Sequence, residues 1–189
     1  MKINNKNLDS LIKKEAVPEF VIQGERYAAR MLYQSEHFIV GLKVVDWHFD
    51  DLIIINKRYL QSLRYGKQEK FREKVLLSIN SINDREMPQW LDVASWAELL
   101  RSLESKRLLC CVQSKKKDDD FRVGFVSQVS EKKFGFHRID LSYDLVGSEP
   151  EKFLFKNIGY ISLDNEYCLG IEEFVNSRRG GKYRVGKTV

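Results

Sequence analysis

The residues of this chain that come nearest to an enzyme site are an aspartate and a Glu-x-Lys element that follows it. Asp120 precedes an apolar run, and Glu131 and Lys133 come after that run. Metal-dependent nucleases combine such groups, because the carboxylates hold Mg²⁺ and the lysine steadies the attacking water. Here, however, Glu131 and Lys133 lie in the charged sequence SEKK, which is typical of a hairpin turn. We therefore favour an ordinary surface turn over a metal-dependent nuclease.

Two further sets of side chains could do chemistry, and both have simpler interpretations. His48, Asp50 and Asp51 could form one corner of a metal site, but no further set of His, Cys or Asp has ligand spacing around them. Cys110 and Cys111 lead into a strand-like run, where free cysteine usually behaves as a small hydrophobic residue. We therefore predict no catalytic residue, no metal and no cofactor.

The C-terminal segment, residues 178–189, is the best candidate for binding an anionic partner. It contains no acid, and its binding candidates are Arg178, Arg179, Lys182, Tyr183, Arg184 and Lys187. The whole chain has 32 Lys and Arg residues and 27 Asp and Glu residues. Five of the cations lie in this segment, so the rest of the chain has 27 residues of each sign and is neutral. Such a segment can follow a phosphate backbone while the tyrosine stacks on a base. The alternatives are a solvated, disordered end or a protein-binding tail.

Length and composition limit the class of protein. The 189 residues suffice for one medium domain or two small ones, and the 43% that are apolar suffice for a core. No apolar run reaches transmembrane length, and the N-terminal sequence lacks the apolar stretch of a signal peptide. Three cysteines cannot build a disulfide framework or a zinc ribbon. We therefore expect a reduced, cytoplasmic protein.

The first half of the chain predicts a helix followed by a β-meander. Leu8, Leu11 and Ile12 share one face of a short helix over residues 8–15, which Pro18 would end. β-Branched and aromatic residues then predict three strands, with turns at 35–36 and 48–51: residues 20–34, 37–47 and 51–60.

Residues 67–82 are ambiguous on sequence alone. Phe71, Val75 and Ile79 have a helical spacing, but the run VLLSI would also suit a strand.

The second half begins after a linker-like stretch at residues 82–90 and repeats the same kind of pattern. Ser95 and Glu98 have the capping-box spacing at the start of a helix over residues 95–109, whose apolar stripe includes Trp96 and Leu99. Four strand-like segments follow, at residues 108–114, 120–129, 133–146 and 151–163. A short helix at residues 165–177 ends the pattern. Gly124 would allow a bend in the central hairpin.

The two halves share short matches that predict an internal repeat. Phe38–Gly41 matches Phe121–Gly124 at an offset of 83 residues, and Phe71 matches Phe155 at an offset of 84. Such a repeat would give two small barrels, or two sheets packed as a pseudo-dimer.

Several elements of the second half occur in the order of a known fold. A helix precedes the Phe-x-Val-Gly element at 121–124, and an Ile-Asp step at 139–140 follows. An apolar strand at 153–161 and the pair Glu166-Tyr167 complete the order. In this respect residues 95–175 resemble a set of small, uncharacterised bacterial proteins with an SH3-like or Sm-like barrel. The resemblance implies a fold and no activity. The chain departs from the family pattern after the Ile-Asp step, where LSYDLVG replaces a glycine-bearing turn.

We predict an α+β, β-rich protein of two small SH3-like or Sm-like antiparallel β-barrel units, each preceded by a short helix. The predicted parts are residues 1–82, residues 83–177 and a flexible basic tail at 178–189. We expect a non-enzymatic binding or regulatory module that engages a macromolecule, foremost another protein, because small barrels bind through loops and strand edges. The alternative is RNA or single-stranded nucleic acid bound through the tail. Open strand edges also favour a homodimer, and no membrane partner is expected.

Overall fold

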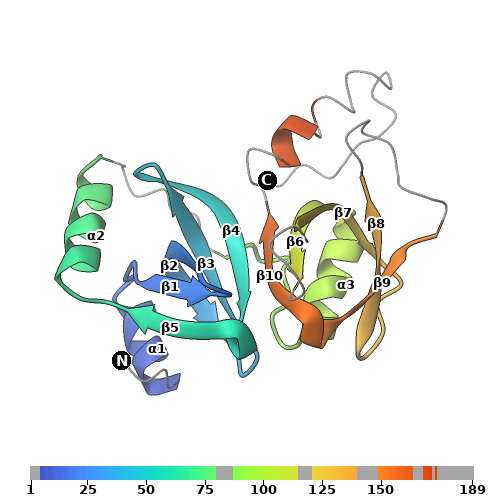
Figure 1. Cartoon of the computed structure of the whole chain (residues 1–189), viewed down its shortest axis with the longest axis horizontal. Helices are drawn as coiled ribbons and strands as arrows, with labels where there is room; N and C mark the ends of the chain where they lie inside the picture. The colour runs from blue at the N-terminus through green and yellow to red at the C-terminus, as the bar shows by residue number, and fades with distance from the viewer. Residues whose placement is uncertain are drawn as a thin grey trace. The chain divides into compact units, whose positions relative to one another are not determined.

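The structure is a computed structural model that describes residues 5–79, 87–114, 121–139, 149–163, 168–171 and 173. The chain divides into two compact units, Met1–Pro88 and Gln89–Val189, and both are α+β and rich in antiparallel strands (Figure 1). The predicted boundary after residue 82 and the predicted tail at 178–189 lie outside the described residues. None of the helices described here is long and apolar enough to span a membrane.

The N-terminal unit is a helix followed by a four-stranded meander and a returning fifth strand. Its elements are α1 (Asn5–Lys13), β1 (Glu19–Ile22), β2 (Glu25–Gln34), β3 (Phe38–Val45), β4 (His48–Asn56), η1 (Lys57–Tyr59), β5 (Leu60–Arg64) and α2 (Lys67–Ile79). Strand β5 pairs with β1, so the order across the sheet is β5-β1-β2-β3-β4.

Two hairpins of this unit turn through loops of only two residues, which were not predicted from the sequence. Gln23 and Gly24 have φ values of 55° and 92°, and Asp46 and Trp47 have φ values of 42° and 67°. A two-residue hairpin loop with positive φ at both positions matches the right-handed twist of the strands it joins. The predicted single strand at 20–34 is therefore wrong, and the predicted turn at 48–51 is replaced by the turn at 46–47.

The core of the N-terminal unit follows from alternation along the strands. Phe20 and Ile22 of β1, and Ala29 and Met31 of β2, are buried, while their neighbours in sequence face the other side. Leu8 of α1 packs into the same unit and is buried as the predicted apolar face requires.

The C-terminal unit has the same order of elements. They are α3 (Trp96–Lys106), β6 (Leu109–Ser114), β7 (Phe121–Ser127), β8 (Lys133–Arg138), β9 (Glu151–Leu154), η2 (Phe155–Asn157) and β10 (Ile158–Leu163). Strand β10 returns to pair with β6, which gives the order β10-β6-β7-β8-β9. The predicted N-cap of the helix is confirmed, because Ser95 Oγ accepts a hydrogen bond of 3.2 Å from Glu98 N.

Neither unit is a closed barrel by its described strand pairs. In each order the two outer strands are not paired with one another, so closure of the two predicted barrels is not confirmed. The sequence matches used to predict the repeat also fall on different elements. Phe38–Gly41 lies on the third strand of its unit and Phe121–Gly124 on the second, while Phe71 lies in α2 and Phe155 in η2. The alignment at offsets of 83 and 84 is therefore wrong.

Gly124 is required for a reason other than the predicted bend. A Cβ atom at this position would lie 2.0 Å from the carbonyl oxygen of His137 on the neighbouring strand β8. The backbones of β7 and β8 approach so closely that only glycine fits between them.

We predict that Gly124→Ala destabilises the protein at the upper end of the roughly 1–3 kcal/mol that overpacking costs, because the clash is with backbone. Gly170→Ala is the matched control, since a Cβ atom there meets nothing within 4 Å. Urea denaturation followed by circular dichroism measures both. Equal midpoints for the two variants would contradict the close approach.

Candidate functional site

The structure describes only some of the side chains that the sequence proposed for chemistry. Glu131 lies in the bend between β7 and β8, and Lys133 begins β8, both of them exposed. Asp120 and the basic tail residues lie outside the described ranges. His48 is exposed, whereas Asp51 is fully buried beside Lys43. Within the part of the chain that the structure describes, no group of three or more His, Cys, Asp or Glu could hold a metal ion.

The structure instead reveals a pocket of about 290 Å³ in the N-terminal unit. Residues from β1, β2, the β3–β4 hairpin and α2 line it: Glu19, Arg26, Ala28, Val44, Asp46, Trp47 and Arg72. None of these residues was singled out by the sequence patterns.

The floor of the pocket is a row of side chains across three strands. Glu19 of β1 lies opposite Ala28 of β2, and Ala28 lies opposite Val44 of β3. Residues that oppose each other in neighbouring strands share one face of the sheet. Because Ala28 has the smallest side chain of the row, the sheet surface is hollow at this position.

The tip of the β3–β4 hairpin forms one rim of the pocket. Trp47 has a φ of 67° and remains 48% exposed, although a left-handed backbone costs a residue other than glycine about 1–2 kcal/mol. Asn-Gly or Asp-Gly would form this turn with less strain. A large aromatic side chain held here against its conformational preference is a feature that concentrates at functional sites.

Helix α2 forms the opposite wall, and two glutamates hold it in place. Glu69 accepts a hydrogen bond of 2.6 Å from Gly66 N and pairs with Arg64 at 3.2 Å. Glu73 accepts a hydrogen bond of 3.0 Å from Val17 N and another of 3.0 Å from Tyr65 Oη. The positions of these carboxylates place Arg72, which lies between them in sequence, against β1.

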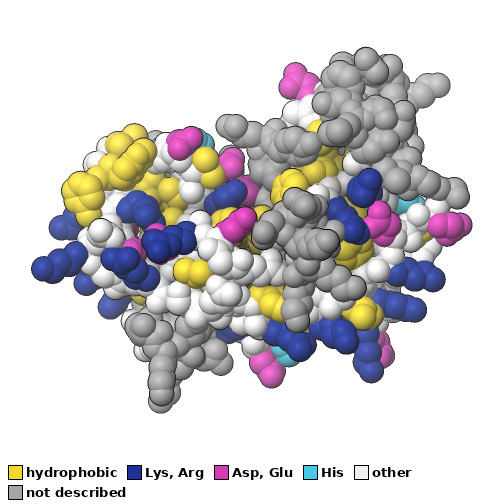
Figure 2. Space-filling model, viewed as in Figure 1, with side chains coloured by type: hydrophobic (Ala, Val, Ile, Leu, Met, Phe, Trp, Pro, Cys, Tyr) yellow, Lys and Arg dark blue, Asp and Glu magenta, His cyan; other side chains and the backbone are white. Residues whose placement is uncertain are grey.

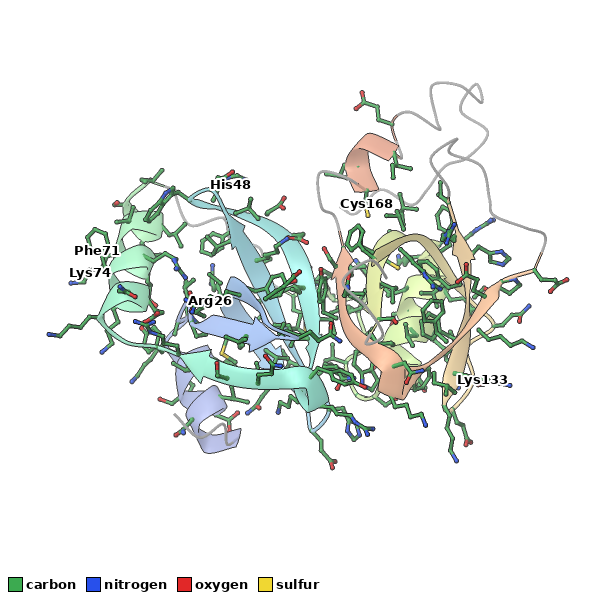
Figure 3. The ribbon with its side chains drawn as sticks, viewed as in Figure 1. Arg26, His48, Phe71, Lys74, Lys133 and Cys168 are labelled. Atoms are coloured by element: carbon green, nitrogen blue, oxygen red, sulfur yellow. The ribbon has the colours of Figure 1, made fainter. Side chains whose placement is uncertain are left out.

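The helical spacing of Phe71, Val75 and Ile79 correctly indicates a helix, but the stripe is not its buried face. Phe71 and Ile79 are 64% and 63% exposed, and Glu69 and Leu76 are buried instead. Phe71 and Lys74 project from α2 away from the sheet of their unit (Figure 3). The outward face of α2 is therefore both apolar and basic.

Glu19 pairs with two arginines in the pocket, which also contains Asp46 as a second acid. The Glu19 carboxylate, 14% exposed, lies 3.8 Å from Arg26 Nη1 and 3.7 Å from Arg72 Nη2. One carboxylate thus serves two guanidinium groups. Arg72 Nη1 is buried and has no hydrogen-bond partner among the described residues. A buried donor without an acceptor costs about 1–3 kcal/mol.

The pKa of Glu69 records the electrostatics that hold α2. Burial alone would raise this pKa, but the backbone N–H groups of Gly66 and Glu69 and the charges of Arg64 and Arg72 outweigh burial. The pKa is therefore lowered from its ordinary value of 4.5, and the carboxylate is ionised in the folded unit at neutral pH.

Comparisons of the chain with protein-family models, curated proteins and solved structures found no match. The function must therefore be argued from the pocket and its surroundings.

We predict that Trp47→Gly is more stable than Trp47→Ala by about 1–2 kcal/mol, because only glycine adopts a φ of 67° without strain. Both variants lose the same indole ring, so the difference between their free energies of unfolding reports the backbone strain at position 47. The same pair of substitutions at Arg26, in strand β2, should give the opposite order. Urea denaturation measures all four variants, and a more stable alanine variant at position 47 would exclude a strained turn.

We predict that Glu69→Gln destabilises the protein by about 1–3 kcal/mol at pH 7, because the buried charge-assisted hydrogen bonds are lost. Since the folded pKa is lowered, the contribution of Glu69 is complete above pH 4.5 and disappears as the pH falls through the folded pKa. The difference in the free energy of unfolding between wild type and Glu69→Gln should therefore decrease on acidification. Glu131→Gln, at an exposed turn, should leave the free energy of unfolding unchanged at pH 7 and after acidification. A difference that is independent of pH would contradict this role of Glu69.

Proposed function

We propose that this chain is a non-enzymatic binding module that holds an acidic side chain of a partner protein in the pocket beside Trp47. The observation that carries the proposal is the Arg72 guanidinium in the pocket: its Nη1 has no hydrogen-bond partner among the described residues, and it shares the Glu19 carboxylate with Arg26. A carboxylate entering the pocket would pair with the Arg72 guanidinium, whose side chain is 29% exposed. Arginine forms its strongest hydrogen bonds with such groups.

The size of the pocket supports a side chain as the ligand. Sites for small molecules usually enclose about 300–1,000 Å³. This pocket has about 290 Å³, and its rim residue Arg26 has a side chain that is 71% exposed. The volume lies at the lower end of that range, and the exposed rim leaves the pocket open to a side chain of a larger partner.

The surroundings of the pocket support a protein as the partner. Figure 2 shows hydrophobic side chains on the surface at α2, where Phe71, Leu77 and Ile79 are exposed. Trp and Arg are the residue types that contribute most often to protein–protein binding energy, and both types line the pocket.

The shared order of elements supports a common architecture for the two units. Each has a helix, four strands in a meander, a short 3-10 helix and a strand that returns to the first. We propose that they are two copies of a small SH3-like or Sm-like unit. Such units bind through loops and strand edges, as the hairpin tip at Trp47 would here.

We predict that a display library of peptides, selected on the full chain, returns sequences rich in Asp and Glu. Ala28→Trp should abolish their binding, because the indole fills the hollow in the floor of the pocket. Ala94→Trp is the matched control, since Ala94 is an exposed alanine in the C-terminal unit. Fluorescence anisotropy of labelled peptides gives the affinities. Acidic peptides that bind the Ala28→Trp variant as tightly as wild type would exclude the pocket as their site.

Single-stranded nucleic acid is the second candidate ligand, and the outward face of α2 favours it. Lys67, Lys70 and Lys74 are exposed there with Phe71 between them, and Figure 2 shows Lys and Arg side chains gathered over α2 and β1. Cations beside an exposed aromatic ring are the pattern that follows a phosphate backbone and stacks a base. The basic segment at 178–189 adds five cations to the charge available for a phosphate backbone.

The two functions are separated by the same anisotropy measurement with a labelled oligonucleotide. Nucleic-acid binding should weaken steeply with salt and should be lost on Lys70→Glu with Lys74→Glu or on removal of residues 178–189. It should also survive Ala28→Trp. Oligonucleotide binding with these properties, together with no acidic peptide from the selection, would replace the protein-binding proposal by the nucleic-acid one.

A further inference from the structure

Two cysteines that are far apart in sequence meet in the C-terminal unit. Cys111 lies on β6 and Cys168 lies in the helical residues 168–171, and their sulfur atoms are 3.3 Å apart. Both side chains are buried, and both are free thiols. In Figure 3, Cys168 points from its helical segment toward the sheet of its unit.

The surroundings of the pair keep both sulfurs close together. Leu109, Val123 and Ile171 form one buried cluster with the two cysteines, and Phe125 and Ile139 pack against it. The two segments that carry the sulfurs differ in how firmly they are held. Cys111 sits in a strand paired on both sides, with β7 and with β10. Cys168 sits in a helical segment whose next residue, Leu169, is exposed.

We propose that Cys111 and Cys168 form a redox-active dithiol that a low-molecular-weight disulfide, such as oxidised glutathione, converts into an intramolecular disulfide. The proposal concerns the C-terminal unit and is independent of the pocket in the other unit.

The reaction proceeds by two thiol–disulfide exchanges. Local opening of the helical segment exposes Cys168, whose thiolate attacks one sulfur of the small disulfide. The S–S bond of the small disulfide breaks, a mixed disulfide forms on Cys168, and one small thiol leaves. The thiolate of Cys111 then attacks Cys168 Sγ, so that the Cys111–Cys168 bond forms and the second small thiol leaves. Two electrons and two protons pass from the pair to the small disulfide.

The geometry makes the second step intramolecular and short. A disulfide bond is about 2.05 Å long, so sulfurs that begin 3.3 Å apart need only a small side-chain rotation after the segment closes again. Because the bond links positions separated by 57 residues, it would tie the helical residues 168–171 to strand β6 of the sheet. Burial keeps the closed, reduced pair slow to react, so the rate of oxidation should follow the rate of local opening.

Cys110 provides an internal control. It precedes Cys111 on β6, is equally buried, and has a pKa that burial and the neighbouring Cys111 both raise. In alternating strand geometry its side chain points to the other face of the sheet. Cys110 should therefore keep its thiol when the pair is oxidised.

The test incubates the full chain with mixtures of reduced and oxidised glutathione and counts free thiols after denaturation in a maleimide reagent. The number of free thiols per wild-type chain should fall from three to one. The oxidised chain should carry no glutathione and should form no disulfide with a second chain. Peptide mapping should show the Cys111–Cys168 link. Cys110→Ser should lose two thiols in the same buffers, whereas Cys111→Ser should form no internal disulfide and should retain glutathione on Cys168.

The thiol count and the peptide map of wild type are sufficient to test the proposal, even if a serine variant fails to fold. Three free thiols in wild type at every glutathione ratio would overturn the proposal and leave the pair as buried small hydrophobic residues. A mapped link that includes Cys110 would overturn it as well.

Discussion

Hydrogen bonds from backbone N–H groups to two carboxylates hold α2, and the candidate site depends on them. Glu73 accepts a hydrogen bond from Val17 N on the inner face of the helix, where an apolar stripe is usual. Glu69 caps the start of the helix through Gly66 N and pairs with Arg64 of β5. This arrangement turns Phe71 outward and brings Arg72 against Glu19. The same two bonds thus produce the wall of the pocket and the apolar, basic surface beside it.

The pocket combines three features that cost stability and that nothing in the folding of the unit requires. A large aromatic residue occupies a left-handed turn, a buried guanidinium nitrogen has no acceptor among the described residues, and an alanine leaves a hollow in a row of larger side chains. Local departures from good packing and good turn chemistry are expected where a protein binds something. Because all three features occur in this pocket of the N-terminal unit, we propose that the pocket is where the partner binds.

The sequence indicated the α+β class, the capped helix at Ser95 and most strand-bearing regions, because these depend on local periodicity and capping. Gly24 marks the first hairpin turn in the sequence, but the turn at Asp46 and Trp47 could not be located, since positive φ at residues other than glycine leaves no compositional mark. The pocket depends on strand register, which sets Glu19, Ala28 and Val44 side by side. Alternation alone does not fix that register. An aromatic residue between two apolar runs, in VVDWHF, was the one signal available for the hairpin tip.

The central claim is that a partner carboxylate meets Arg72 in the pocket, and a double-mutant cycle tests it most directly. The affinity of an acidic peptide and of the same peptide with Glu replaced by Gln would be measured on wild type and on Arg72→Met. We expect the Glu-to-Gln change to weaken binding to wild type about tenfold or more, which corresponds to a coupling of about 1.4 kcal/mol, and to matter much less on Arg72→Met. An equal loss on both proteins would show that the carboxylate does not meet Arg72.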